Sequence, residues 1–215
     1  MTTAALVSFV AEAPVPPEVA TVAEAYCAEP STVDRHGDPV GFWVVCALLS
    51  HGADRSTLVD ATAVGLEVAL RIRGGLHGKL AGGWDAYCPA VSIGVAAGVA
   101  RLDGLAASAV ARALAIAATQ AGGLAECVGT PLGEFQHQRA AENGRQAAVL
   151  ARAGMTAPAA PLEGRRGLFP VMAPGADPST VVDRLGRHWL LADRSTGTGG
   201  GSTSGAVGYA REVLP

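Results

Sequence analysis

The chain has 215 residues, of which 49% are hydrophobic and only 5% are aromatic, and its net charge is −3. This length fits one domain of ordinary size or two small ones, and the apolar share excludes a disordered protein. The weak negative charge, with no cluster of basic residues, argues against a nucleic-acid partner. A core of Ala, Val and Leu suits closely packed helices.

The first half of the chain predicts helices separated by short loops. Residues 6–10 can form a short helix, and Pro16-Pro17-Glu18 is typical of the start of a second one. The stretch 31–39 predicts a loop, and an apolar helix is expected over residues 42–50. Ser56 is the expected N-cap of the next helix. Its core-facing stripe has helical spacing and consists of Leu58, Ala61, Gly65, Val68, Ala69 and Ile72.

The second half predicts further helices made of small residues. Glycines over residues 74–83 interrupt the pattern, and a helix is then expected from residue 89 or 90 to residue 102. Ser108 is expected to cap another helix, which ends near Gln120. A loop reaching about Gln136 should precede a helix with a face thin enough for close backbone approach. That face consists of Ala140, Ala141, Gly144, Ala147, Ala148 and Ala151.

Beyond Pro158 the composition changes, and regular elements become short. The sequence predicts a short helix near residues 179–185 and a strand-like segment, HWLLAD, over residues 188–193. Residues 195–205 are rich in Gly, Ser and Thr. No Lys follows them and no GxGxxG spacing is present, so a flexible loop is a better interpretation than a phosphate-binding loop.

The cysteine spacing and the apolar segments exclude several classes of protein. Cys27, Cys46, Cys88 and Cys127 lie far apart with no CxxC or CxxH pair, so neither a metal site nor a disulfide framework is expected. The first residues lack the basic start of a signal peptide. The longest apolar stretch, residues 86–100, is interrupted by a proline and two glycines. We expect a cytoplasmic protein with no membrane partner.

Four stretches carry specific motifs in a fixed order: TLVDATAVGLEVALRIR, GWDAYCPAVSIGVAAGVARLDGL, RAAENGRQAAVLARAGMTAP and PLEGRRGLF. They resemble the MmgE/PrpD family, which includes 2-methylcitrate dehydratase and cis-aconitate decarboxylase. The family counterparts are a helix ending in GYEVAxRL, a GWHPT segment, a GRAAxxGxxAAxLAxxG helix and an LEGxxGF signature. The resemblance covers residues 57–169. It implies an all-α, compact helical bundle that forms a single domain over residues 1–215. It also implies a homodimer that needs no metal or organic cofactor.

The sequence also departs from the family pattern. Family members are longer and carry a second, α+β lid domain, so the resemblance implies a chain without the lid. The family's acidic DFDDT motif, which acts around the substrate, has no counterpart before residue 42. His36 falls near the HP motif that follows it in the family. His36 is therefore a candidate catalytic residue, and the alternative is a solvated histidine in a polar loop.

The family's catalytic histidine in GWHPT falls on Asp85, and its threonine falls on Tyr87. Beside Trp84 and Tyr87, in a wall of Ala and Gly, the Asp85 carboxylate would be desolvated. Desolvation would raise its pKa and suit it to proton transfer near neutral pH. The alternative is that Asp85 only caps the helix that follows.

Two lysines of the family are also lost. One falls on Gly133, beside Glu134, and the other falls within residues 195–203. In the family such cations hold a tricarboxylate, so we expect no turnover of 2-methylcitrate or cis-aconitate. His137 and Arg139 lie at the expected start of a helix, where the helix dipole favours an anion. The alternative is that both belong to an exposed turn.

Two hypotheses about function follow. The first is a divergent enzyme that catalyses a cofactor-independent proton transfer, as in dehydration, isomerisation or cyclisation, on a small and rather apolar intermediate of specialised metabolism. The second is a non-catalytic binding or partner subunit derived from such an enzyme. A dry pocket at Trp84 and Tyr87 would favour the enzyme, and a filled core there would favour the partner subunit. Candidate catalytic residues are Asp85, Tyr87, His36 and His137, and candidate substrate-binding residues are Trp84, Arg139 and Glu134.

Overall fold

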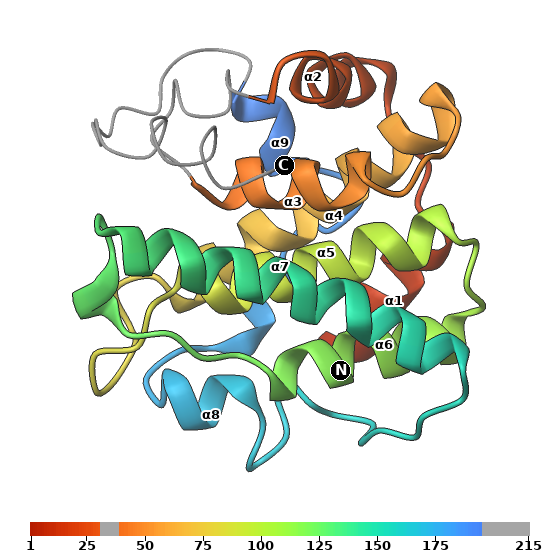
Figure 1. Cartoon of the computed structure of the whole chain (residues 1–215). Coiled ribbons are helices and arrows are strands. Elements are labelled where there is room, and N and C mark those ends of the chain that lie inside the picture. Colours follow the sequence, from red (N-terminus) through yellow and green to blue (C-terminus); the bar gives the residue numbers. More distant parts are fainter. Residues whose placement is uncertain (31–38, 195–215) are drawn as a thin grey trace.

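The computed structural model describes residues 1–30 and 39–194, which form an all-α bundle without a strand (Figure 1). An isolated bridge joins Trp84 to Leu124. His36 and the loop over residues 195–205 lie outside the described residues. The helices are α1 Thr2–Glu12, α2 Pro17–Ala28, α3 Pro39–Leu49, α4 Arg55–Leu76, α5 Tyr87–Leu102, α6 Ala107–Thr119, α7 Pro131–Arg152, α8 Leu168–Met172 and α9 Leu190–Asp193, with 3-10 helices η2 Ala125–Cys127 and η3 Pro178–Val182.

Helix α5 is the centre of the bundle and is buried from Cys88 to Ala100. Helix α7 crosses one side of the bundle, with α5 and α4 behind it (Figure 1). Small residues allow this close packing: a Cβ atom added at Gly94 of α5 would lie 2.5 Å from the Cβ of Ala69 in α4. A Cβ at Gly144 of α7 would overlap the Ser92 carbonyl oxygen of α5. The small-residue faces expected on these helices therefore do form the helix contacts.

Two helix caps differ from the sequence prediction. The N-cap of α4 is Asp54, whose carboxylate accepts hydrogen bonds from the backbone N–H groups of Ser56 and Thr57. The Ser56 hydroxyl also donates to Asp54 at 2.7 Å, which places Ser56 inside the first turn. Helix α6 begins after Ala106 with no side-chain cap, so Ser108 already lies within that helix. Both predictions of a serine cap were wrong, because each helix begins earlier than its serine.

Helix α7 also begins earlier than expected. Thr130 is its N-cap and accepts a hydrogen bond from the Gly133 N–H, and Pro131 occupies the first helical position. The predicted loop up to Gln136 was therefore wrong. His137 lies in the second turn of α7, and it is buried, so the predicted exposed turn and the predicted position at the helix start are both excluded for this residue.

A buried ion pair fastens the chain after η3 to α4. The Arg71 Nε donates to Glu67 Oε1 at 2.6 Å, and both side chains are buried. Arg71 also donates to the carbonyl oxygens of Val181, Asp183 and His188, while Glu67 accepts from the N–H groups of Leu190 and Leu191. The strand predicted over residues 188–193 was wrong. Its last four residues form the short helix α9, Leu190–Asp193, which is held at its start by the Glu67 carboxylate.

A helix that crosses a bilayer needs about 20 consecutive, mainly apolar residues. Within residues 1–30 and 39–194, no helix combines enough length with enough apolar character to cross a membrane.

Candidate functional site

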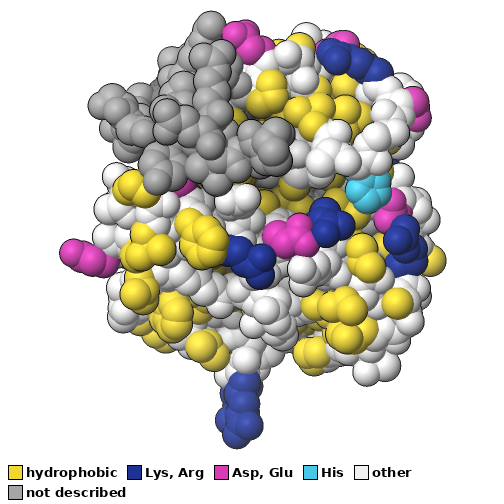
Figure 2. All heavy atoms as spheres, in the orientation of Figure 1, with side chains coloured by type: hydrophobic (Ala, Val, Ile, Leu, Met, Phe, Trp, Pro, Cys, Tyr) yellow, Lys and Arg dark blue, Asp and Glu magenta, His cyan; other side chains and the backbone are white. Residues whose placement is uncertain are grey.

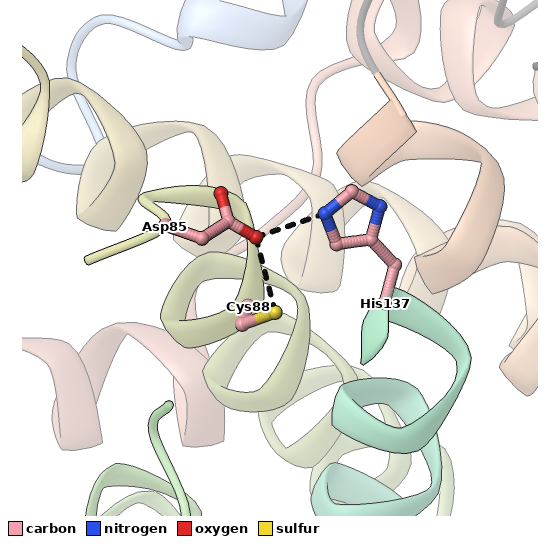
Figure 3. Close-up of side chains that lie close together, drawn as sticks. All are labelled: Asp85, Cys88 and His137. Carbon is pink, nitrogen blue, oxygen red and sulfur yellow. Dashed lines mark hydrogen bonds and ion pairs between the residues drawn. The ribbon is translucent and has the colours of Figure 1, made fainter. Parts of the chain in front are cut away.

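Three buried polar side chains meet where α5 begins and α7 passes over it (Figure 3). Asp85 lies in the turn before α5, and Cys88 lies one helical turn further along the chain. His137 reaches them from the second turn of α7. The exposed fractions are 2% for Asp85, 4% for Cys88 and 2% for His137. Polar groups this deeply buried need hydrogen-bond partners, and here they supply them to one another.

The Asp85 carboxylate is the centre of this cluster. Its Oδ2 atom lies 2.9 Å from His137 Nε2, 3.1 Å from Cys88 Sγ and 3.2 Å from Gln136 Nε2. Its Oδ1 atom accepts the backbone N–H of Tyr87 at 2.9 Å. Asp85 thus binds the first N–H of α5 from the residue before the N-cap, which is Ala86, and also receives three side-chain donors. We call Asp85, Cys88 and His137 the acid–thiol–imidazole cluster.

A pair of loops holds Asp85 in place. The Asp85 N–H donates to the Gly123 carbonyl at 3.0 Å, and the Ala125 N–H donates to the Gly83 carbonyl at 2.9 Å. The Gln136 amide bridges this pairing to α7, because it bonds both the N–H and the carbonyl of Leu124 as well as Asp85. The position of the carboxylate is thus fixed by backbone on one side and by α7 on the other.

The environment keeps Asp85 ionised. Burial alone would raise the pKa of Asp85, but hydrogen bonds from His137, the Tyr87 amide and Cys88, together with the charge of His137, outweigh it and lower the pKa. The raised pKa predicted from the sequence was therefore wrong, because these donors outweigh the effect of desolvation. Burial and the neighbouring Asp85 charge raise the pKa of the Cys88 thiol. Cys88 is a protonated donor and not a ready nucleophile.

These hydrogen bonds fix the tautomer of His137. An ionised carboxylate can only accept, so the proton between the two residues belongs to His137 Nε2. The other ring nitrogen, Nδ1, is buried and has no hydrogen-bond partner among the residues that the structure describes. In Figure 3 it points away from Asp85. His137 thus keeps one ring nitrogen buried and unpaired beside the ion-pair contact with Asp85.

The family follows from the sequence match. A family model for the MmgE/PrpD N-terminal domain matches residues 9–181. This chain belongs to the MmgE/PrpD family. The match runs from α1 to η3 and includes the whole acid–thiol–imidazole cluster, so the family predicted from the motifs is confirmed. No curated protein matches the sequence.

The backbone leaves no room for a side chain at residue 133, the position at which the sequence resemblance places a family lysine. Gly133 is buried in the first turn of α7, and a Cβ atom there would overlap the carbonyl oxygen of Cys127. No side chain fits at residue 133 while the backbone keeps this path. The cluster therefore has no cation from this position.

Of the other candidate residues, Tyr87 contacts the cluster directly. Tyr87 is half-buried and packs edge-on against His137, with ring centroids 5.6 Å apart. The guanidinium carbon of Arg73 lies 5.0 Å from the centre of the Tyr87 ring. The partners of Asp85 do not include the remaining candidates. These are Trp84 and Arg139, which are exposed, and Glu134, which is half-buried.

The sequence prediction missed Cys88 and Gln136. The available signal was the spacing of Asp85 and Cys88, since residues three apart share one face of a helix. The three polar atoms of the cluster lie within 4.8 Å of one another and offer oxygen, sulfur and nitrogen. Zn²⁺ accepts all three ligand types, so this cluster has the donor set for a metal as well as for proton exchange. No CxxC or CxxH spacing marks this cluster, because His137 comes from another helix.

Proposed function

We propose that this chain is an enzyme that moves a proton with His137, oriented by Asp85, and needs no cofactor. The observation that carries this proposal is the 2.9 Å contact between His137 Nε2 and Asp85 Oδ2, together with the unpartnered Nδ1. A buried carboxylate that holds one imidazole nitrogen orients the ring and stabilises the imidazolium formed when the other nitrogen takes a proton.

The roles differ from those suggested by the sequence alone. Asp85 is a positioning residue, because its oxygens are already engaged and its pKa is lowered. His137 Nδ1 is the proton acceptor. In a dehydration, it would take the proton from a carbon next to a carbonyl group and return it to the departing hydroxyl as water forms. Isomerisation or cyclisation would return the same proton to another carbon of the substrate.

The charge around the cluster favours a small, rather apolar substrate. Residue 133 carries no lysine, and Arg73 is stacked on Tyr87. A tricarboxylate needs several cations in its pocket, whereas a neutral carbonyl compound does not. We place the substrate among small intermediates of specialised metabolism, and the protein in the cytoplasm as a homodimer. Tyr87 packs against His137, and we propose that it contacts the reacting group of the substrate.

A specific observation also favours a partner subunit. Five apolar side chains near the cluster are between 38% and 58% exposed. Figure 2 shows hydrophobic side chains gathered over the N-terminal end of α7, while charged ones lie along its middle. We call this set the apolar rim: Trp84, Leu124, Val128, Leu132 and Phe135. A surface of this kind suits contact with another protein chain.

The proton-transfer proposal is tested by exchange of substrate hydrogen for deuterium. Wild-type protein in D₂O is incubated with a panel of apolar β-hydroxy and β-keto thioesters, and mass spectrometry follows deuterium at the carbon next to the carbonyl. We expect exchange by the wild type and a loss of about a hundredfold in His137→Gln. His77→Gln, an exposed histidine after α4, is the control and should exchange normally. Equal exchange by His137→Gln would refute the role of His137.

A further inference from the structure

A pocket lies away from the acid–thiol–imidazole cluster, between the C-terminal end of α6 and the segment leading into α8. Its volume is about 480 Å³, within the range of small-molecule sites. Neither Asp85 nor any of its partners lines it. Its walls are mainly apolar, with two arginines among them. The residues used below are Ala118, Ala121, Leu168, Met172, Arg165 and Arg166.

The α6 wall of this pocket presents methyl groups and few free polar groups. The carbonyls of Ala117 and Ala118 accept the N–H groups of Gln120 and Ala121. The Thr119 hydroxyl donates to the Ile116 carbonyl at 2.9 Å. Since the last carbonyls of the helix are occupied, Ala118 and Ala121 offer an apolar contact. Leu168 and Met172 of α8 face the same space.

Two arginines line the pocket, and no Asp or Glu among the described lining residues neutralises their charges. Arg165 and Arg166 are exposed, and neither forms a hydrogen bond or ion pair with any described residue. No Asp or Glu lines the pocket. The acid next to them in sequence, Glu163, is turned towards α1, where it accepts the N–H and the hydroxyl of Thr3. The two positive charges are therefore available to an anion.

The arginines sit on a loop that is already held in shape. The Gly164 N–H donates to the Ala160 carbonyl at 3.0 Å, and the Leu168 N–H donates to the Pro161 carbonyl at 2.8 Å. The Phe169 N–H donates to the Leu162 carbonyl at 3.1 Å, so both ends of the loop are tied together. A ligand would not have to order this backbone, which lowers the cost of binding.

We propose that this pocket binds a small amphipathic carboxylate. Its apolar chain packs against α6 and α8, and its carboxylate is held by Arg165 and Arg166. The opposite orientation is unfavourable, because the C-terminal end of a helix repels an anion. This inference is independent of the proton transfer at His137, since the two sites share no residue.

Titration followed by backbone amide NMR tests both the ligand and the place. Hexanoate is added to the ¹⁵N-labelled full-length protein. Hexanol, which has the alkyl chain without the charge, and acetate, which has the charge without a long alkyl chain, are added in separate titrations. We expect hexanoate to bind more tightly than either, with shifts concentrated at residues 118–121 and 164–172. Equal affinity for hexanoate and hexanol would overturn the role of the arginines. Shifts centred on Tyr87 and Gln136 would mean binding at the cluster instead, and would also overturn the proposal.

Single variants separate charge from folding. Arg165→Gln and Arg166→Gln should each weaken hexanoate binding about fivefold and leave hexanol binding unchanged. The control is Arg187→Gln, an exposed arginine outside the pocket, which should bind like the wild type. Both arginines are exposed, so their loss does not threaten folding. Unchanged hexanoate affinity in both pocket variants would refute the site.

Discussion

At the scale of single residues, the charge of Asp85 determines what His137 can do. Asp85→Asn keeps an oxygen that can accept the Tyr87 N–H, but it removes the charge that stabilises an imidazolium. We expect deuterium exchange to fall about a hundredfold in this variant. Asp85→Ala should also lose about 1–3 kcal/mol of unfolding free energy in urea, because buried donors lose their acceptor. Wild-type exchange in Asp85→Asn would show that the carboxylate is only a cap.

The same carboxylate should make stability depend on pH. The pKa of Asp85 is lowered in the folded protein. Its stabilising contribution is therefore fully present above the unfolded pKa of about 4, and is lost as the pH falls through the folded pKa. We expect the unfolding free energy of the wild type to drop more steeply below about pH 4 than that of Asp85→Asn. Urea unfolding of both proteins across this range gives the comparison, and parallel curves would contradict it.

At the scale of helices, the contact between α4 and α5 depends on glycine. In Gly94→Ala the new methyl group would lie 2.5 Å from the Ala69 Cβ, so the helices must separate. We expect a loss of about 1–3 kcal/mol in unfolding free energy. Gly74→Ala is the matched control in α4, where a Cβ meets nothing within 4 Å, and it should stabilise the helix by about 0.5–1 kcal/mol. Equal effects of the two substitutions would mean that α4 and α5 are not this close.

The Glu67–Arg71 pair should matter far more than an exposed pair. Arg71→Met leaves the Glu67 carboxylate buried without its cation and frees three backbone carbonyls. We expect a loss of about 3–5 kcal/mol. In the control Arg55→Gln, which breaks the exposed pair with Glu24, the loss should stay below about 1 kcal/mol. Chemical denaturation measures both, and a small loss for Arg71→Met would contradict the structural role of the pair.

At the scale of the whole molecule, the apolar rim predicts self-association. A surface with Leu132 and Phe135 exposed on one helix turn is best covered by a second copy of the chain. We expect a dimer at micromolar concentration in sedimentation experiments, and a monomer for the double variant Leu132→Gln/Phe135→Gln. Met155→Gln, an exposed apolar residue after α7, is the control and should remain dimeric. A monomeric wild type would contradict the dimer and leave the apolar rim to a different protein chain, as the partner hypothesis proposes.

Much of the fold, but little of the site, was predictable from the sequence. Helical periodicity and small-residue faces indicated the bundle. Gly94 and Gly144 lie where two helix backbones approach too closely for a Cβ atom, so glycine at these positions is a signal of helix packing. The start of α7 was missed although Thr130-Pro131 is a capping signal. With α7 expected to begin too late, His137 was placed at a helix start or in an exposed turn. Its burial beside Asp85, on which the proposed proton transfer depends, was therefore not predicted. The lowered pKa of Asp85 depends on donors brought from α7, which no local pattern reveals.

The tautomer of His137 tests the proton-transfer site most directly. Long-range ¹H–¹⁵N spectra of protein labelled at histidine identify which ring nitrogen carries the proton, and the His137→Gln spectrum assigns the signal. Because Asp85 is ionised and accepts from Nε2, the neutral imidazole should carry its proton on Nε2 and leave Nδ1 bare. A proton on Nδ1, with Nε2 as the acceptor, would require a protonated Asp85 and would contradict the proposed roles of both residues.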